Sequence, residues 1–211
     1  MQPNNYITGY PDSLPSFLLA GEVHVPAPNK HFQRTTKDWI IYVITDGTMQ
    51  ISEGEQTYTL TAGDIMIFSP DRCHFGHLTN DHIDYYYIHF QWESLRDISM
   101  STEAYLQAMN RHPFSPEISS RQELLLPKYF HPAHASFRGI LQQTQYLVKD
   151  SSRNFLHQQK KMMPCYFCCY FICPSRNCPI FYTQKQTAHP YPFRFWSIYK
   201  QTTPKRSPVL P

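Results

Sequence analysis

The stretch that decides the fold is residues 63–74, which read GDIMIFSPDRCH. Gly63 and Asp64 have the chemistry of a turn, the apolar run Ile65–Phe68 reads as a short strand, and Ser69-Pro70-Asp71 forms a second turn. His74 then opens the next strand. A short strand between two turns, followed at once by another strand, is typical of an antiparallel β structure.

Residues 16–92, on both sides of this stretch, have the same character. They are rich in Ile, Val, Thr, Tyr and Phe, which pack well on a pleated surface. We expect strands, in chain order, at Phe17–Val25, Trp39–Thr45, Thr48–Ser52, Gln56–Thr61, Ile65–Phe68, Cys73–His77 and His82–Trp92. Asp46-Gly47 predicts a tight hairpin between the second and third of them. Many short strands at close spacing predict a sandwich or a barrel.

Helical signals begin near Asp97 and become clear after Pro132. Apolar side chains recur there at helical spacing, with Ser136 as the expected N-cap, and they form one stripe: Phe137, Ile140, Leu141, Thr144, Leu147 and Val148. The stripe has two interpretations. The helix either covers the chain's own sheet or pairs with a second copy of the chain. Before the helix, Glu123–Leu126 reads as a short buried segment that ends at Pro127.

The last part of the chain has a different composition. Residues 1–150 carry 10 Lys and Arg against 16 Asp and Glu, whereas residues 151–211 carry 9 Lys and Arg and no acid or glycine. This tail has eight prolines and five of the six cysteines, so we expect it to be irregular and disordered. Three interpretations are open: a zinc module, a basic tail that binds nucleic acid, or the product of a slipped reading frame near Lys160–Met163. We favour the third.

Two passages resemble the N-terminal domain of AraC-type transcription regulators. Residues 63–74 resemble the second cupin motif, and YYYIHF (residues 85–90), together with WIIYVITDG (residues 39–47), resembles the sensor domain of that family. The resemblance implies a mainly β fold: a cupin-like jelly-roll barrel over residues 1–95, a helical linker and dimerisation region over 96–161, and the atypical tail over 162–211. It also implies a small-molecule effector, a sugar in the first instance, and a homodimer. DNA would be bound only by full-length relatives with a helix-turn-helix domain, before which we expect this chain to be truncated.

The candidate effector pocket follows from strand periodicity and from this resemblance. Tyr85, Tyr87 and His89 alternate, so they share one face of a strand, and the resemblance favours that face as the inward one. Phe75 and His77 form a similar pair on the preceding strand, and Arg34 lies about where relatives present a basic contact. Aromatic faces can stack on the C–H surfaces of a sugar, while Arg, His and Tyr supply hydrogen bonds. For the dimer, the resemblance selects five residues of the helical stripe: Phe137, Ile140, Leu141, Thr144 and Val148.

We expect neither a metal nor another cofactor in the barrel. A metal-binding cupin has a glutamate seven residues before the hairpin glycine, and Ile40 occupies that position, which leaves His74 as a lone candidate ligand. Nucleophile elbows and phosphate-binding glycine loops are absent from the sequence, so we expect a sensor and not an enzyme. Two alternatives stay open: a metal-free cupin that isomerises a sugar, and a nucleic-acid-binding protein that acts through its basic tail.

The sequence also predicts a cytoplasmic protein. The longest apolar run, Cys165–Cys173, is much shorter than the about 20 residues that cross a bilayer. The first basic residue is Lys30, so no charged region precedes the apolar residues of the N-terminus, as it would in a secretory signal. The residues before the tail contain a single cysteine, Cys73, which excludes a disulfide scaffold for that part.

Overall fold

The computed structural model describes residues 4–10, 15–110, 124–153 and 161–162, all of which belong to the compact unit Met1–Ser175. The tail predicted over 162–211, with its three interpretations, lies outside the described residues except for Met162. The strands are β1 (Asn4–Gly9), β2 (Ser16–Val25), β3 (Arg34–Thr35), β4 (Trp39–Glu53), β5 (Gln56–Thr61), β6 (Ile65–Phe68), β7 (Cys73–His77), β8 (Ile83–Gln91), β9 (Arg96–Met100), β10 (Leu124–Pro127), β11 (Tyr129–Phe130) and β12 (Lys161–Met162). The helices are α1 (Thr102–Asn110) and α2 (His134–Arg153), and neither could cross a membrane.

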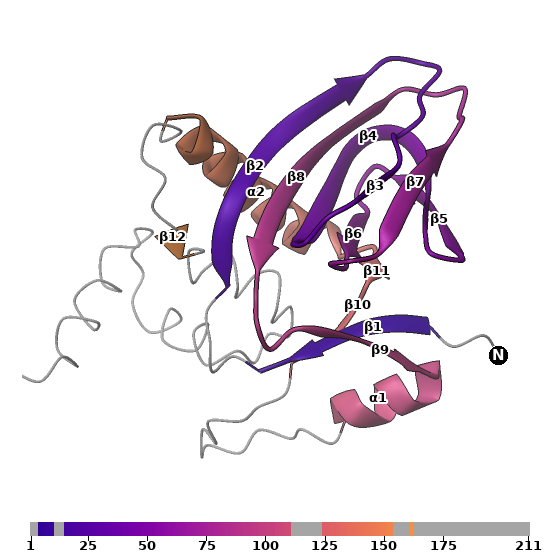
Figure 1. The fold of residues 1–211 in the computed structure, drawn as a ribbon, viewed down its shortest axis with the longest axis vertical. Coiled ribbons are helices and arrows are strands. Elements are labelled where there is room, and N and C mark those ends of the chain that lie inside the picture. The colour runs from indigo at the N-terminus through magenta and orange to yellow at the C-terminus, as the bar shows by residue number, and fades with distance from the viewer. Residues whose placement is uncertain (1–3, 11–14, 111–123, 154–160, 163–211) are drawn as a thin grey trace, which may run out of the picture. The chain divides into compact units, whose positions relative to one another are not determined.

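The fold is mainly β, as predicted, and its strands form two antiparallel sheets (Figure 1). The larger sheet has the order β11-β6-β4-β8-β2-β12, and β5 and β7 pair with the second half of β4. The long strand β4 therefore belongs to two walls. Residues from both of its halves meet in one buried cluster that includes Ile40, Ile44, Met49 and Ile51, so the walls face each other as in a cupin-like jelly roll.

The prediction of a hairpin at Asp46-Gly47 is wrong. Residues 39–53 form one continuous strand, and the register of β4 against β8 shifts between Ile44 and Asp46, which is a β-bulge. Gly47 has a φ of 74°, and a Cβ at this position would lie 2.1 Å from the carbonyl oxygen of His82. The glycine is needed here for a bulge and a close backbone approach, which require the same residue types as a turn.

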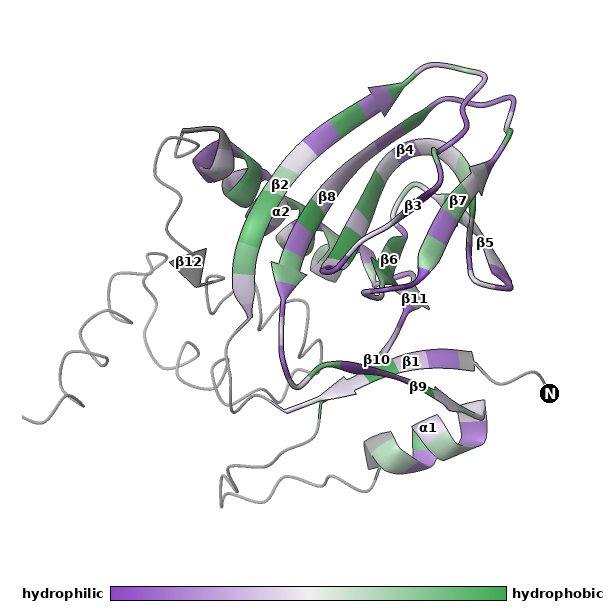
Figure 2. Cartoon of the chain, viewed as in Figure 1, coloured by the Kyte–Doolittle hydropathy of each residue, from purple (hydrophilic) through white to green (hydrophobic). Residues whose placement is uncertain are grey.

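Alternation along the strands divides the core into two layers. Ile40, Tyr42 and Ile44 of β4 point into the barrel. Ile41 and Val43, between them, point to the outer face of the sheet and pack with residues of α2. Figure 2 shows hydrophobic residues along β4, and hydrophobic residues interspersed with hydrophilic ones on β8 and α2; these elements supply much of both layers.

Helix α2 lies on the chain's own sheet, against β2 and β8. Ile140 and Thr144 are 1% and 0% exposed, and Leu147 is buried in the same layer. Phe137, Leu141 and Val148 pack on this layer and are partly buried. The expectation that Ile140 and Thr144 pair with a second copy is thereby corrected, because both are already buried inside one chain. The helix also begins at His134, before the expected cap at Ser136.

A second sheet, in the order β10-β1-β9, joins the first strand of the chain to two strands that follow the larger sheet's β8 in sequence. The helical signal expected to begin near Asp97 begins later, at Thr102, where α1 starts, because residues 96–100 form β9 and pair with β1. The segment expected before Pro127 is β10, in which Leu126 is buried. Pairing partners about 90 to 120 residues away, which no local pattern reveals, decide these elements.

A buried ion network ties the end of β4 to the segment between β10 and β11. The Lys128 ammonium group contacts the Glu53 carboxylate, and both side chains are 1% exposed. Lys128 Nζ also donates to Ser69 Oγ at 2.7 Å and lies 3.1 Å from Asp97 Oδ1. The Ser69 amide donates to Glu53 Oε1 at 2.7 Å, and Arg72 pairs with Asp97 at 3.1 Å. Each buried charge thus has an opposite charge and a hydrogen-bond partner, as burial requires.

Candidate functional site

A group of polar and aromatic side chains lies inside the barrel, between its two walls. Strand β8 contributes Tyr85, Tyr87 and His89, which face inward, while the alternate residues Tyr86 and Ile88 pack on the α2 side. Tyr85 and His89 are 5% and 7% exposed, and Tyr87 is partly buried. The face that the resemblance favoured is therefore the inward one, and a ligand-binding role for it stays a prediction.

Arg34 joins this face to the opposite wall. Its Nε donates to His74 Nε2 at 2.9 Å, and its Nη2 donates to the Tyr42 hydroxyl at 2.9 Å. The Tyr42 hydroxyl lies 2.9 Å from His31 Nε2, and His31 Nδ1 lies 2.7 Å from the carbonyl oxygen of Phe32. Because a carbonyl can only accept, the proton of neutral His31 is on Nδ1, and Tyr42 donates to Nε2. The result is one chain of hydrogen bonds, His74–Arg34–Tyr42–His31.

The imidazoles and phenols of this chain are neutral near pH 7. Burial lowers the pKa of His31 to about 4, and the Arg34 charge acts in the same direction. Burial and the Arg34 charge likewise lower the pKa of His74 to about 4. Burial raises the pKa of Tyr42 and of Tyr85 above the ordinary value of a phenol. In this hydrogen-bonded chain the Arg34 guanidinium thus carries the formal charge, and the other three side chains are neutral.

The other end of the cluster is a pair formed by Asp38 and His89. The Asp38 carboxylate accepts a hydrogen bond from His89 Nδ1. Burial lowers the pKa of His89, although the carboxylate acts in the opposite direction. The ring of Tyr87 stands perpendicular to that of His89, with 5.6 Å between the centroids. Gly21 on β2 makes room for Tyr87, because a Cβ there would lie 2.3 Å from the phenol oxygen.

Two residues of the predicted pocket lie elsewhere. Alternation on β7 turns His74 and Gly76 inward, so Phe75 and His77 are on the other face of that strand. His77 Nε2 lies 2.8 Å from Ser52 Oγ, and Phe75 contacts the ring of His77. The structure thus brings together Arg34, Tyr85, Tyr87 and His89, but not Phe75 and His77.

Sequence reasoning missed four members of the cluster, namely His31, Asp38, Tyr42 and His74 as a site residue. Tyr42 could have been identified from the sequence, because it lies on the same face of its strand as Ile40 and Ile44. His31 and Asp38 lie outside regular strands, where periodicity carries no signal. His74 Nε2 accepts a hydrogen bond from Arg34, and an absence of metal in the barrel stays a prediction.

An open pocket of about 430 Å³ lies outside this cluster, near the start of β4 and the end of β8. Its walls include Trp39, Trp92, Ser69 and Asp97. Trp39 and Trp92 belong to the outer core layer and are about 95% buried, so the pocket exposes little of either ring. Lys37, Gln91 and Glu93 form its exposed rim. The inward cluster differs from this pocket, because Arg34, Tyr42, His31 and His74 are joined to one another by hydrogen bonds.

Comparison with known proteins gives one family and several similar chains. Residues 23–144 match the family described as "AraC-like ligand binding domain". An uncharacterized HTH-type transcriptional regulator, YisR of Bacillus subtilis, is 25% identical over 141 residues, which are 66% of this chain and 48% of that protein. The chain thus spans about half the length of this relative.

Two solved structures are similar in part. A cupin protein from Bacteroides fragilis is 24% identical, with 36% of this chain and 68% of the other covered and a TM-score of 0.33. A cupin-like protein from Thermotoga maritima is 15% identical, with 44% and 81% covered and a TM-score of 0.32. Scores of this size carry no information on function.

Proposed function

Since the chain belongs to the AraC-like ligand binding domain family, we propose that it senses a sugar-like small molecule inside its barrel and transmits that signal to transcription. The observation that supports this proposal is the inward cluster in which Arg34, Tyr42 and two neutral histidines form a chain of hydrogen bonds. Such a cluster is costly to bury unless its groups are satisfied, and a ligand with several hydroxyls can exchange hydrogen bonds with every member.

The chemistry of the cluster suits a polyol. Tyr85 and Tyr87 present aromatic surface for the C–H faces of a sugar ring, while Arg34 donates and the Asp38–His89 pair can accept or donate. The charges are one guanidinium and one carboxylate at opposite ends, so a neutral sugar or one that carries a single carboxylate matches the site. Phe32 is 64% exposed, and its ring lies 5.2 Å from the Arg34 guanidinium, which gives a ligand an apolar contact at the outer side.

We propose, further, that the sensor acts in the cytoplasm as a homodimer, and that DNA is bound by another part of full-length relatives. The α2 stripe is occupied within the chain, so a second copy would contact the opposite face of α2, where Tyr146 is 57% exposed. Analytical ultracentrifugation of the full chain and of Tyr146→Glu tests this arrangement. We expect a dimer for the parent and a weaker dimer for the variant, whereas a monomeric parent contradicts the proposal.

The sensor hypothesis is tested by thermal unfolding against a panel of neutral monosaccharides and sugar acids. A compound present at 100 times its dissociation constant stabilises the protein by about 2.7 kcal/mol, which raises the melting temperature by about 5–10 °C. We expect at least one compound to give such a rise in the parent and in Phe75→Ala, whose side chain is on the other face of β7, but not in Tyr87→Ala. A panel without any shift contradicts a sugar-like effector. Turnover of the stabilising compound contradicts a sensor and supports the isomerase alternative.

A further inference from the structure

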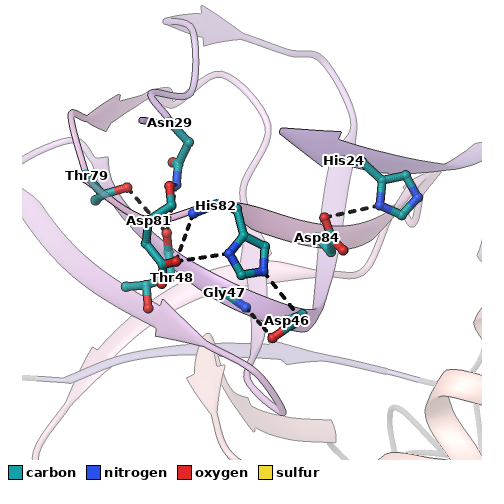
Figure 3. Close-up of polar contacts among 9 residues, drawn as sticks. All are labelled: His24, Asn29, Asp46, Gly47, Thr48, Thr79, Asp81, His82 and Asp84. Atoms are coloured by element: carbon teal, nitrogen blue, oxygen red, sulfur yellow. Dashed lines mark hydrogen bonds and ion pairs between the residues drawn. The ribbon is translucent and has the colours of Figure 1, made fainter. Parts of the chain in front are cut away.

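Three neighbouring strands place potential metal ligands in one row on the outside of the barrel. His24 on β2 is the register partner of Asp84 on β8, and Asp84 is in turn the register partner of Asp46 on β4. His24 Nδ1 lies 3.1 Å from Asp84 Oδ1. Register partners point to the same side of a sheet, so the three side chains form a line across it. His82, two residues before Asp84, completes the group (Figure 3).

The bulge in β4 creates this row. Up to Ile44, which pairs with Tyr85, regular pairing would bring Thr45 opposite Asp84. The extra residue at the bulge brings the Asp46 carboxylate there instead, and bulges commonly re-aim a side chain in this way. Gly47 then lets the β4 backbone approach His82, and the Thr48 amide donates to the His82 carbonyl at 3.0 Å. The β-bulge, at the position where a turn was predicted, therefore brings these side chains together.

Two carboxylates directly opposite each other repel, and a cation between them would relieve this repulsion. Among the described residues, the ion pairs of Asp46 and Asp84 are to histidines, not to Lys or Arg. His82 Nε2 lies 3.4 Å from Asp46 Oδ2, which is longer than a good charge-assisted hydrogen bond. Ligand atoms of Asp46, His82 and Asp84 all lie within 4.8 Å of one another.

The surroundings hold His82 in the orientation that a metal ligand needs. Its Nδ1 lies 3.0 Å from Asp81 Oδ1, and this leaves Nε2 directed at the Asp46 carboxylate. Ligating histidines usually donate their second ring N–H to a carboxylate in this manner. The Asp81 backbone is fixed in turn by the buried amide of Asn29, which donates to the carbonyls of Asp81 and Thr48 at 2.7 and 2.9 Å.

We propose that Asp46, His82 and Asp84, with His24 as the fourth ligand, bind a divalent transition-metal ion such as Zn²⁺. Two imidazoles with two carboxylates match the ligands of zinc, cobalt and nickel, whereas calcium and magnesium prefer oxygen alone. Ligand atoms around a tetrahedral zinc ion lie roughly 3.3 Å apart, given bonds of about 2.0–2.1 Å. The pairs His24 Nδ1–Asp84 Oδ1, at 3.1 Å, and His82 Nε2–Asp46 Oδ2, at 3.4 Å, are close to that distance. The bound ion would tie β2, β8 and β4 together at one end of the barrel, apart from the inward cluster.

Cobalt(II) is the probe that tests this site in the full chain, because its absorption spectrum reports the ligands. Nitrogen and oxygen ligands give visible d–d bands, whereas the cysteines of residues 165–178 would add intense thiolate charge transfer in the near ultraviolet. We expect one equivalent of Co²⁺ at pH 7.5 with d–d bands and no thiolate band. His82→Ala and Asp84→Asn should lose the d–d bands, and Asp81→Asn should weaken binding about 10–100-fold.

Asp71→Asn is the matched control, since Asp71 is an exposed carboxylate paired with Lys37 and remote in sequence from the row. It should bind Co²⁺ like the parent. The proposal is overturned by a parent that takes up no Co²⁺ at millimolar concentration, by a spectrum of thiolate ligation alone, or by a spectrum that His82→Ala and Asp84→Asn leave unchanged. Circular dichroism of each variant establishes that the loss of binding is not a loss of fold.

Discussion

Lys128→Met should destabilise the protein strongly, and a second substitution should reverse most of the loss. Lys128 Nζ is the cation beside the Glu53 carboxylate, and both side chains are 1% exposed. Met fills a similar volume without the charge. Asp97 keeps Arg72 and the Ser69 hydroxyl after this change, but Glu53 keeps only the Ser69 amide.

The magnitude follows from the burial of Glu53. Removal of one partner of a buried ion pair leaves an uncompensated charge and costs about 3–5 kcal/mol. For a chain of this size, that loss lowers the melting temperature by about 6–20 °C. In Lys128→Met/Glu53→Gln the charge is gone, and the Gln carbonyl can still accept from the Ser69 amide. Replacement of both partners by neutral groups of similar shape is often close to neutral, so the double variant should approach the parent.

Urea unfolding of the parent, both single variants and the double variant measures the coupling as a double-mutant cycle. Lys37→Met is the control, because Lys37 pairs with Asp71 at the surface and should cost less than about 1 kcal/mol. A cost below about 1 kcal/mol for Lys128→Met, or a double variant as unstable as the sum of the two singles, would refute the argument from buried charge.

Three further predictions concern acid stability, the inward cluster and α2. Because burial lowers the pKa of His31 and His74 to about 4, the unfolded chain binds more protons than the folded one between pH 6.5 and 4, and the free energy of unfolding should fall as the pH falls through that range. The loss is at most about 3 kcal/mol for each histidine, and unfolding titrations of His74→Gln should show a shallower slope than the parent. Gly21→Ala should displace the Tyr87 phenol and weaken effector binding in calorimetry, with an unchanged affinity arguing against Tyr87 as a contact. Ile140→Ala should cost about 2–5 kcal/mol in thermal unfolding because the residue is 1% exposed, while Tyr146→Ala, at 57% exposed, should change stability little.

Strands with local signals could be predicted from the sequence. Residues 56–61, 65–68 and 73–77 have the expected bounds in the structure, because turn residues flank them on both sides. The strands β1 and β9 could not be predicted in this way, since each is defined by its pairing with the other across about 90 residues. The prediction of a turn at Asp46-Gly47 failed for a different reason: a bulge and a hairpin both favour a glycine with positive φ.

The candidate site was predicted in part. Alternation placed Tyr85, Tyr87 and His89 on one face, but only the packing of Tyr86 and Ile88 on the α2 side shows which face is inward. The same reasoning failed for Phe75 and His77, where the period was right and the chosen face was wrong. No pattern connects His31 to Tyr42 or Asp38 to His89, because these contacts depend on how a loop returns to the barrel. The α2 stripe likewise shows that a face is buried without showing what covers it.

The most direct test of the central claim, that an effector binds inside the barrel, is NMR of the histidine rings during titration with a stabilising compound. His31, His74 and His89 lie in or beside the inward cluster, whereas His24 and His77 are on outer faces. Single His→Gln variants assign the signals. We expect the ring signals of His31, His74 and His89 to shift together with one dissociation constant while those of His24 and His77 stay in place. A titration that moves His77 or His24 and leaves the three inward histidines unchanged would contradict the account.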